Sequence, residues 1–274
     1  MPDDQSADHA DRPDVEIVEV TPQIAETWLS RNPNNRNLRR PVVDSYARDI
    51  EAGRWRLNGE TVKFGPGGVL LDGQHRLSAV VQAGTSVPMV VVRNLGGDVM
   101  ATVDTGAKRS YADALKLAGE ENTTTLAAVV RRAVMWERGM RTNTGAIKPT
   151  ALEMDDFLDR HPEIRASADL ASRLASRETL PASVFGLCHH LFVRLDPEQA
   201  DLFLMRVADG DEVPKEHPIA QLRRRITLLR VRGGRINETE GLALAIQTWN
   251  TVRAGHTRLR MPQALTNDNF PVPQ

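Results

Sequence analysis

The chain has 274 residues, of which 41% are hydrophobic, and its formal net charge is −1 at pH 7. This length allows two hydrophobic cores, and the balanced charge excludes nucleic-acid binding through bulk basicity, so any such surface must come from local clusters. A single cysteine, Cys188, excludes an intramolecular disulfide framework, and no apolar run reaches the roughly 18 residues of a membrane span. The polar, acidic N-terminus lacks the order of a signal peptide, so we expect a cytoplasmic protein with no membrane partner.

Strand and helix patterns are mixed in the N-terminal part of the chain. A disordered tail is expected over residues 1–14, followed by a strand at Val15–Val20 whose alternating acidic and apolar residues are typical of a sheet edge. A short helix follows Pro22, and Pro41 opens a second helix that ends at Gly53.

A hairpin and a third helix come next. Residues 61–64 and 69–71 are expected to pair as strands across a glycine-rich turn. Gly73 then breaks the strand, a helix with one apolar face runs to Gly84, and residues 87–92 form a further strand. This mixture of strands and helices predicts an α+β fold.

From residue 110 onward the pattern becomes helical. Helices are expected around residues 126–134, 152–158, 202–207, 219–229 and 242–252. We therefore expect four parts: a disordered tail (1–14), an α+β domain (15–118), a helical domain (119–257) and an extended tail (258–274).

The strand-to-helix turn at Gly73 has the local chemistry of a phosphate site. The helix that starts there directs its unpaired N–H groups and the positive end of its dipole toward the turn, where an anion can bind. Arg76 lies in the first helical turn and carries a planar guanidinium that suits phosphate oxygens. The sequence therefore predicts an anion site at this turn.

The motif Asp72-Gly73-Gln74-His75-Arg76-Leu77 after a strand, with Asn58-Gly59-Glu60 upstream, resembles the ParB N-terminal/sulfiredoxin-like superfamily. Over residues 15–118 the chain looks most like the ParB-like proteins, including those with nuclease domains, of bacteria and their phages or prophages. The resemblance implies a small mixed-sheet domain that binds ATP or CTP, with Mg²⁺, at this turn. Members of the superfamily act as DNA clamps, nucleases, sulfinic-acid reductases or free-serine kinases, so the reaction stays open.

The resemblance also implies which residues bind the nucleotide. Besides the motif, Asp104-Thr105-Gly106 and the following basic pair resemble a second loop of the phage-type members that closes over the phosphates. The nucleotide-binding set is Asp72, Gly73, Gln74, His75, Arg76, Thr105, Lys108 and Arg109.

Individual roles in the motif have alternatives. His75 donates to a phosphate or only fixes the turn, and Asp72 caps the helix or holds Mg²⁺. Gln74 stands where the sulfiredoxins carry a nucleophilic cysteine, so sulfinic-acid reduction is excluded. His75 and Glu60 are the catalytic candidates, and the alternative for Glu60 is a solvated carboxylate at a strand end.

Two arginine-rich segments are candidate DNA contacts. The first precedes the helix opened by Pro41, and the second lies between Pro218 and Arg235, where no acidic residue occurs. The alternatives are a solvated loop and pairing with acidic helices of the same domain. The predicted DNA-binding residues are Arg36, Arg39, Arg40, Arg223, Arg224, Arg225, Arg230 and Arg232.

No metal site is expected in the protein itself, because the adjacent His189 and His190 point about 100° apart on a helix. The favoured function is binding, with or without hydrolysis, of ATP or CTP by a ParB-like protein that acts on or with DNA. The alternatives are a small-molecule kinase that uses Glu60 as base and a non-catalytic nucleotide sensor. Whether the chain is an enzyme, and whether it forms a homodimer, stays open.

Overall fold

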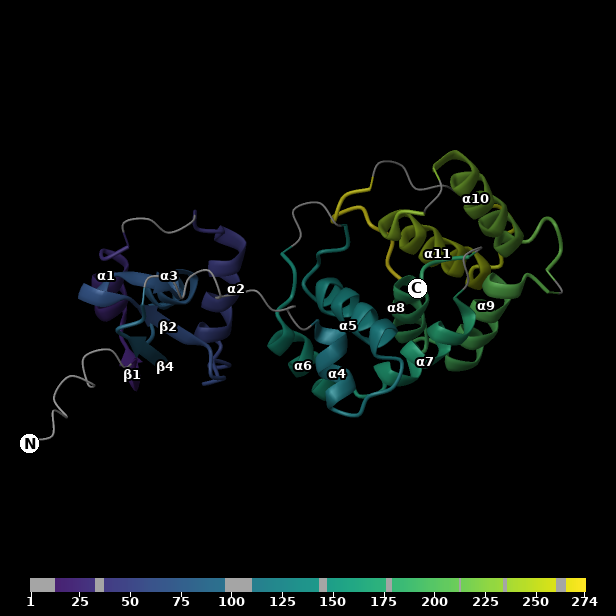
Figure 1. Ribbon diagram of the computed structural model, residues 1–274. Helices are drawn as coiled ribbons and strands as arrows, with labels where there is room; N and C mark the ends of the chain where they lie inside the picture. The colour runs from purple at the N-terminus through teal and green to yellow at the C-terminus, as the bar shows by residue number, and fades with distance from the viewer. Residues whose placement is uncertain are drawn as a thin grey trace, which may run out of the picture. The chain divides into compact units, whose positions relative to one another are not determined.

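The computed structural model describes residues 13–32, 37–96, 110–142, 147–175, 179–211, 213–233, 236–259 and 265–274. It divides into two compact units, Met1–Lys108 and Arg109–Gln274 (Figure 1). The described part of the first unit contains a four-stranded sheet with helices, and that of the second contains helices without a strand. The mixed α+β class expected from the sequence is therefore confirmed.

The first unit contains the predicted hairpin and the helix that follows it. Its elements are β1 (Asp14–Val20), α1 (Pro22–Leu29), α2 (Arg40–Glu51), β2 (Thr61–Phe64), a 3₁₀ turn η1 (Pro66–Gly68), β3 (Leu70–Asp72), α3 (Gln74–Ala83) and β4 (Val87–Arg93). The sheet order is β1-β4-β2-β3, in which β2 runs parallel to β4 and the other neighbours are antiparallel. As predicted, β1 is an edge strand.

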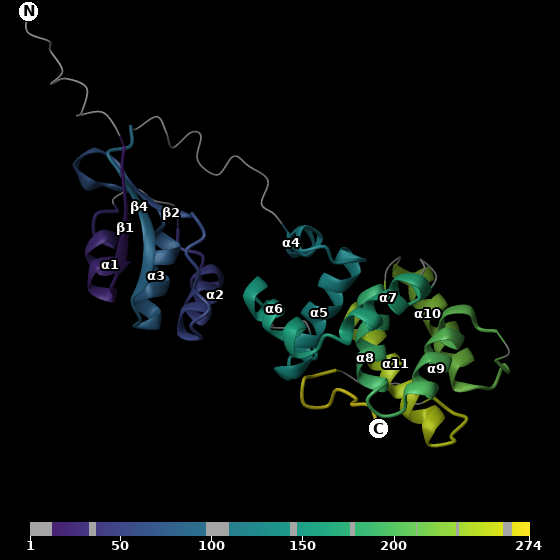
Figure 2. The ribbon, with the colours of Figure 1, turned by 90° about the horizontal axis from the view of Figure 1, so that it is seen from below.

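Helices α1, α2 and α3 form the core of this unit together with one face of the sheet. Alternate β4 side chains, Val87, Met89 and Val91, are buried because successive residues of a strand point to opposite faces. Trp28 of α1 meets Phe64 of β2 edge to face, with ring centroids 5.1 Å apart. Helix α3 lies between α1 and α2 (Figure 2), so its first turn is held by packing on both sides.

The second unit is a bundle of helices. Its elements are α4 (Tyr111–Leu117), α5 (Thr123–Glu137), α6 (Ala151–Arg160), α7 (Ile164–Leu174), α8 (Ala182–Phe192), α9 (Pro197–Asp209), α10 (Pro218–Gly233) and α11 (Glu238–Arg253). The sequence pattern placed residues 110–118 in the first domain, whereas α4 belongs to the second unit. Leu115 of α4 is buried in the helical core, and this packing decides the boundary.

Helix α8 occupies the middle of the bundle, in contact with α5, α7, α9 and α11. Nearly all of its side chains are buried, including Phe185, Leu187 and Cys188. Gly186 allows α5 to approach closely, because a Cβ there would collide with the Val129 side chain.

The C-terminal segment, which we predicted as an extended tail, lies against the second unit. Phe270 is buried and meets Trp136 edge to face at 6.1 Å. Asn250 donates to the Val272 carbonyl and accepts from the Gln274 amide, so the last residues are fixed to α11. Among the described residues, no helix is long and apolar enough to cross a membrane.

Candidate phosphate site at the start of α3

Gly73 joins β3 directly to α3 in a conformation that other residues rarely adopt. Its φ is +102°, and a Cβ at this position would meet the Val62 side chain and Cα at 3.1–3.2 Å. The Leu77 amide donates to the Gly73 carbonyl at 3.0 Å, so the helix begins at the turn itself. Gly73 has no side chain that could cap the helix, which leaves the positive end of the α3 dipole for another negative group.

Arg76 is buried and binds acceptors of its own unit. Its Nη1 donates to Glu60 Oε2 at 2.9 Å and its Nη2 to the Thr61 carbonyl at 2.7 Å, while Asp72 Oδ2 lies 3.5 Å from Nη2. Only 10% of the Arg76 side chain is exposed. The guanidinium therefore ties α3 to β2, a contact that the sequence prediction of a phosphate-facing fork did not include.

Asp72 is surrounded by donors. It accepts from Lys63 Nζ at 2.8 Å and from the Gly73 amide at 2.7 Å. Burial raises the pKa of this carboxyl, but the hydrogen bond and charge of Lys63, the charge of Arg76 and the Gly73 amide together hold the pKa below its usual value. Asp72 thus carries a negative charge that fixes the turn, in line with the turn-acceptor alternative, while Mg²⁺ binding stays a prediction.

Gln74 and His75 attach the segments that precede α2. Asn32 donates to Gln74 Oε1 at 3.1 Å, and the Arg39 amide donates to His75 Nε2 at 3.1 Å. Because Nε2 accepts this bond, the neutral His75 ring carries its proton on Nδ1. The structure thus supports a turn-fixing role for His75; its contact with phosphate stays a prediction.

Several basic residues belong to the described segments that pack around this turn. Arg31 lies beside β3, since its carbonyl accepts from the Leu70 amide at 3.0 Å and its Nη1 approaches Gly68. Arg39 is exposed and its backbone amide donates to the His75 ring, while the side chains of Lys63 and Arg76 reach Asp72. Of these residues, Lys63 contacts Asp72, and Arg76 contacts both Asp72 and Glu60. Neither the Lys63 position nor the Asn32 contact was anticipated, because both depend on the register of β2 and the path of a loop.

Several predicted residues cannot be placed. Thr105, Lys108 and Arg109 of the second loop, and Arg36 of the first arginine-rich segment, lie outside the described residues, as does the side chain of Arg232. Arg40 begins α2 and is exposed. The nucleotide- and DNA-binding roles expected for these residues therefore remain predictions.

The α10 arginines with described side chains contact their own unit. Arg223 donates to the carbonyls of Val207 and Ala208 at the end of α9, and Arg230 donates to the Thr179 carbonyl at 3.3 Å.

The other two α10 arginines, Arg224 and Arg225, differ in exposure. Arg225 lies 3.6 Å from Glu240 of α11, whereas Arg224 is exposed and donates to the Lys215 carbonyl at 3.4 Å. The structure therefore favours pairing within the unit for Arg223, Arg225 and Arg230 and leaves Arg224 at the surface.

The second unit contains a Ser–His–Asp chain that the sequence did not reveal. His189 Nδ1 lies 2.7 Å from Ser167 Oγ, and His189 Nε2 lies 2.9 Å from Asp201 Oδ1. Ser167 is only 1% exposed, so a substrate cannot reach its hydroxyl, and the chain joins α7, α8 and α9 instead. Burial lowers the pKa of His189 and raises that of the neighbouring Cys188 thiol. Over the described ranges, no cluster of three or more His, Cys, Asp or Glu side chains could hold a metal ion.

Comparison with protein-family models, with curated proteins and with solved structures gave no match to this chain.

Proposed function

We propose that the first unit binds a nucleoside triphosphate, ATP or CTP as its Mg²⁺ complex, with the phosphates at the N-terminus of α3, and that the protein acts on or with DNA. The observation that carries the proposal is the left-handed Gly73 turn, which starts a helix without a side-chain cap beside the cationic side chains of Lys63 and Arg76. The motif resemblance to the ParB N-terminal/sulfiredoxin-like superfamily supports the same ligand.

Some residues of the site would hold the turn in place, and others would bind the phosphates. Asp72 contacts both Arg76 and Lys63, and these contacts hold the turn in place. The α3 amides, Lys63 and His75 would contact phosphate oxygens, since ammonium and amide donors at a helix start suit a phosphate chain. The Glu60 side chain is 64% exposed, so a phosphate can compete with it for Arg76 Nη1.

Action on DNA rests on exposed arginines in both units. Arg39 and Arg40 are exposed beside the proposed nucleotide site, and Arg224 is exposed on α10. Contacts of such side chains with DNA phosphates release counterions, so binding would weaken steeply with salt. Nucleotide-dependent DNA binding is the form of action that the ParB-like resemblance implies.

A kinase is the second candidate, and one observation favours it. Arg76 holds the Glu60 carboxylate at 2.9 Å, close to the helix start where the phosphates would lie. A carboxylate fixed there could accept the proton of a substrate hydroxyl during phosphoryl transfer. Phosphate release that needs a small hydroxyl compound and disappears in Glu60→Gln would support this candidate over the DNA-linked one.

Calorimetry with ATP, CTP and GTP, with and without Mg²⁺, tests nucleotide binding. Replacing Lys63 by Gln removes a charge-assisted contact worth about 1.5–3 kcal/mol, so affinity should fall about 10- to 100-fold. The matched control is Lys116→Gln, an exposed lysine of α4 in the other unit, which should bind as the wild type does. Equal affinities for the two variants, or no binding by the wild type, would refute the proposed site.

The same titrations with duplex DNA present separate the remaining readings. Nucleotide-dependent DNA affinity that falls with salt supports the DNA-linked function. Nucleotide binding without turnover and without any effect on DNA would instead identify a non-catalytic sensor.

A further inference from the structure

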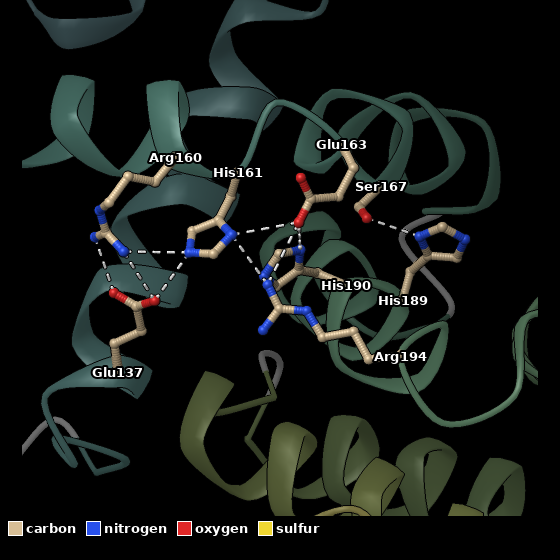
Figure 3. A network of polar contacts seen from close by, with 8 residues as sticks. All are labelled: Glu137, Arg160, His161, Glu163, Ser167, His189, His190 and Arg194. Atoms are coloured by element: carbon tan, nitrogen blue, oxygen red, sulfur yellow. Dashed lines mark hydrogen bonds and ion pairs between the residues drawn. The ribbon is translucent and has the colours of Figure 1, made fainter.

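Four helices of the second unit meet at a cluster of charged side chains and histidines (Figure 3). Glu137 ends α5, Arg160 ends α6, and His161 and Glu163 lie in the turn between α6 and α7. His190 of α8 and Arg194, which follows α8, complete the cluster from the opposite side.

Each ring nitrogen of His161 lies between one guanidinium and one carboxylate. Nε2 lies 3.1 Å from Glu137 Oε1 and 3.2 Å from Arg160 Nη1. Nδ1 lies 3.2 Å from Arg194 Nη2 and 3.4 Å from Glu163 Oε1. A guanidinium only donates hydrogen bonds and a carboxylate only accepts them, so the partner of each nitrogen depends on where the ring carries its protons.

The hydrogen bonds of the surrounding arginines favour one position of the proton on the neutral ring. Arg160 already donates to both Glu137 oxygens, at 3.4 and 3.1 Å, so it does not need Nε2 as an acceptor. Nε2–H then donates to Glu137, and Nδ1 accepts from Arg194. In this state Arg194 bridges His161 and Glu163, whose Oε1 lies 3.4 Å from Arg194 Nη2.

We propose that this junction is a proton-operated switch, in which protonation of His161 exchanges its partner Arg194 for Glu163. A proton on Nδ1 turns that nitrogen from an acceptor into a donor and gives the ring a positive charge. The ring then repels Arg194 and donates to Glu137 and Glu163 together. The shift of partner needs no rearrangement of helices, because Glu163 Oε1 already lies 3.4 Å from Nδ1.

The other titratable groups of the cluster keep their charge state between about pH 5 and 8, the range in which histidine ordinarily changes charge. Burial, followed by the charge of Arg194, lowers the pKa of His190 to about 4, so His190 stays neutral there.

The two carboxylates stay charged over the same range. Burial raises the pKa of both Glu137 and Glu163, but this is outweighed by Arg160 and His161 at Glu137, and by a backbone hydrogen bond and Arg194 at Glu163. Both carboxylates can therefore accept a hydrogen bond from the protonated His161 ring.

The released arginine lies in the connection between α8 and α9. Residues 193–195 form a turn whose Leu195 and Asp196 amides donate to the Phe192 carbonyl. Asp196 caps α9 and lies 3.3 Å from Arg253 of α11. Loss of the Arg194 contacts would loosen this turn, so protonation of His161 would change the structure at the start of α9.

Proton-detected ¹⁵N spectra of the full chain from pH 8 to pH 5 test the switch. We expect His161 to show a protonated Nε2 and an unprotonated Nδ1 at pH 8, and both nitrogens protonated at the acidic end. The backbone amides of residues 193–196 should shift with the same midpoint, and this shift should be lost in His161→Gln.

Charge variants supply the controls. Removing the cation in Arg194→Gln should move the His161 midpoint to higher pH, and removing the carboxylate charge in Glu163→Gln should move it to lower pH. Arg131→Gln, an exposed site on α5, should leave the midpoint unchanged. An unchanged midpoint in Arg194→Gln, or amides at 193–196 that do not follow His161, would overturn the proposal.

Discussion

Arginines in the two units have different surroundings. In the first unit, Arg76 binds Glu60 and Asp72 at the start of α3, where Lys63 also contacts Asp72. In the second unit, Arg223 binds the last carbonyls of α9, and Arg225 lies near Glu240. An arginine-rich sequence therefore does not show whether its side chains point to solvent or to their own unit. Of the two sites, only that of Arg76 has positive side chains beside a helix N-terminus.

The largest expected effect is on the first unit. Arg76→Ala leaves Glu60 and Asp72 without their buried partner, and removing one member of such a buried pair costs about 3–5 kcal/mol. We expect the loss of unfolding free energy to lie near the lower end of this range, because Glu60 is largely exposed. Urea denaturation of the full chain would measure this loss. Arg40→Ala, at an exposed position, serves as the control, and equal stability of the two variants would show that Arg76 does not hold the turn.

The glycines at the two ends of α3 give the next comparison. Both have positive φ, +102° at Gly73 and +63° at Gly84, but only Gly73 has Val62 where a Cβ would lie. Gly84→Ala should cost about 1 kcal/mol from the backbone conformation alone, and Gly73→Ala should cost more, about 2–3 kcal/mol. Equal losses in urea denaturation would mean that the close approach to Val62 is unimportant.

Arg223 and Arg224 compare an inward and an outward arginine on one helix. Arg223→Ala removes the donor of two α9 carbonyls and should destabilise the second unit by about 1–2 kcal/mol, while Arg224→Ala should have almost no effect on stability. Fluorescence anisotropy with labelled duplex DNA should give the opposite ranking. A larger loss of DNA affinity in Arg223→Ala, at matched folded fraction, would argue against Arg224 as the DNA-facing residue.

Asp72 gives a smaller, pH-dependent effect. Because its pKa is depressed in the folded chain, its stabilisation is complete above its usual value of 3.8 and is lost as the pH falls through that value and below it. Wild type and Asp72→Asn should therefore differ in stability at pH 6 and converge toward pH 3. A difference that is constant over this range would show that the Asp72 charge does not stabilise the turn.

The sequence predicted the turn better than its surroundings. The hairpin, Gly73 and the helix ending at Gly84 follow from local turn chemistry and an apolar helical face, and all are confirmed. The contacts of Lys63 with Asp72 and of the Arg39 amide with His75 depend on distant segments, so no local pattern indicates them.

The helical unit was harder to predict in its middle. Helix α8 was not identified as a separate element, because it is buried on nearly every side and so lacks the 3.6-residue periodicity that marks a surface helix. Helix α7 was also missed, although its buried residues Ile164, Ala168 and Ala171 recur at helical spacing. The His161 cluster joins residues far apart in the chain, and neither of its histidines stands in a recognisable motif.

The most direct test of the central claim is a ¹H–¹⁵N spectrum of the full chain titrated with Mg²⁺-ATP and Mg²⁺-CTP. If phosphates bind at the start of α3, the amides of Gly73, Gln74, His75 and Arg76 should shift the most, and those of Ala83 and Gly84 at the other end of the helix should stay in place. No shift in the first four amides, or larger shifts elsewhere, would contradict a nucleotide site at this turn.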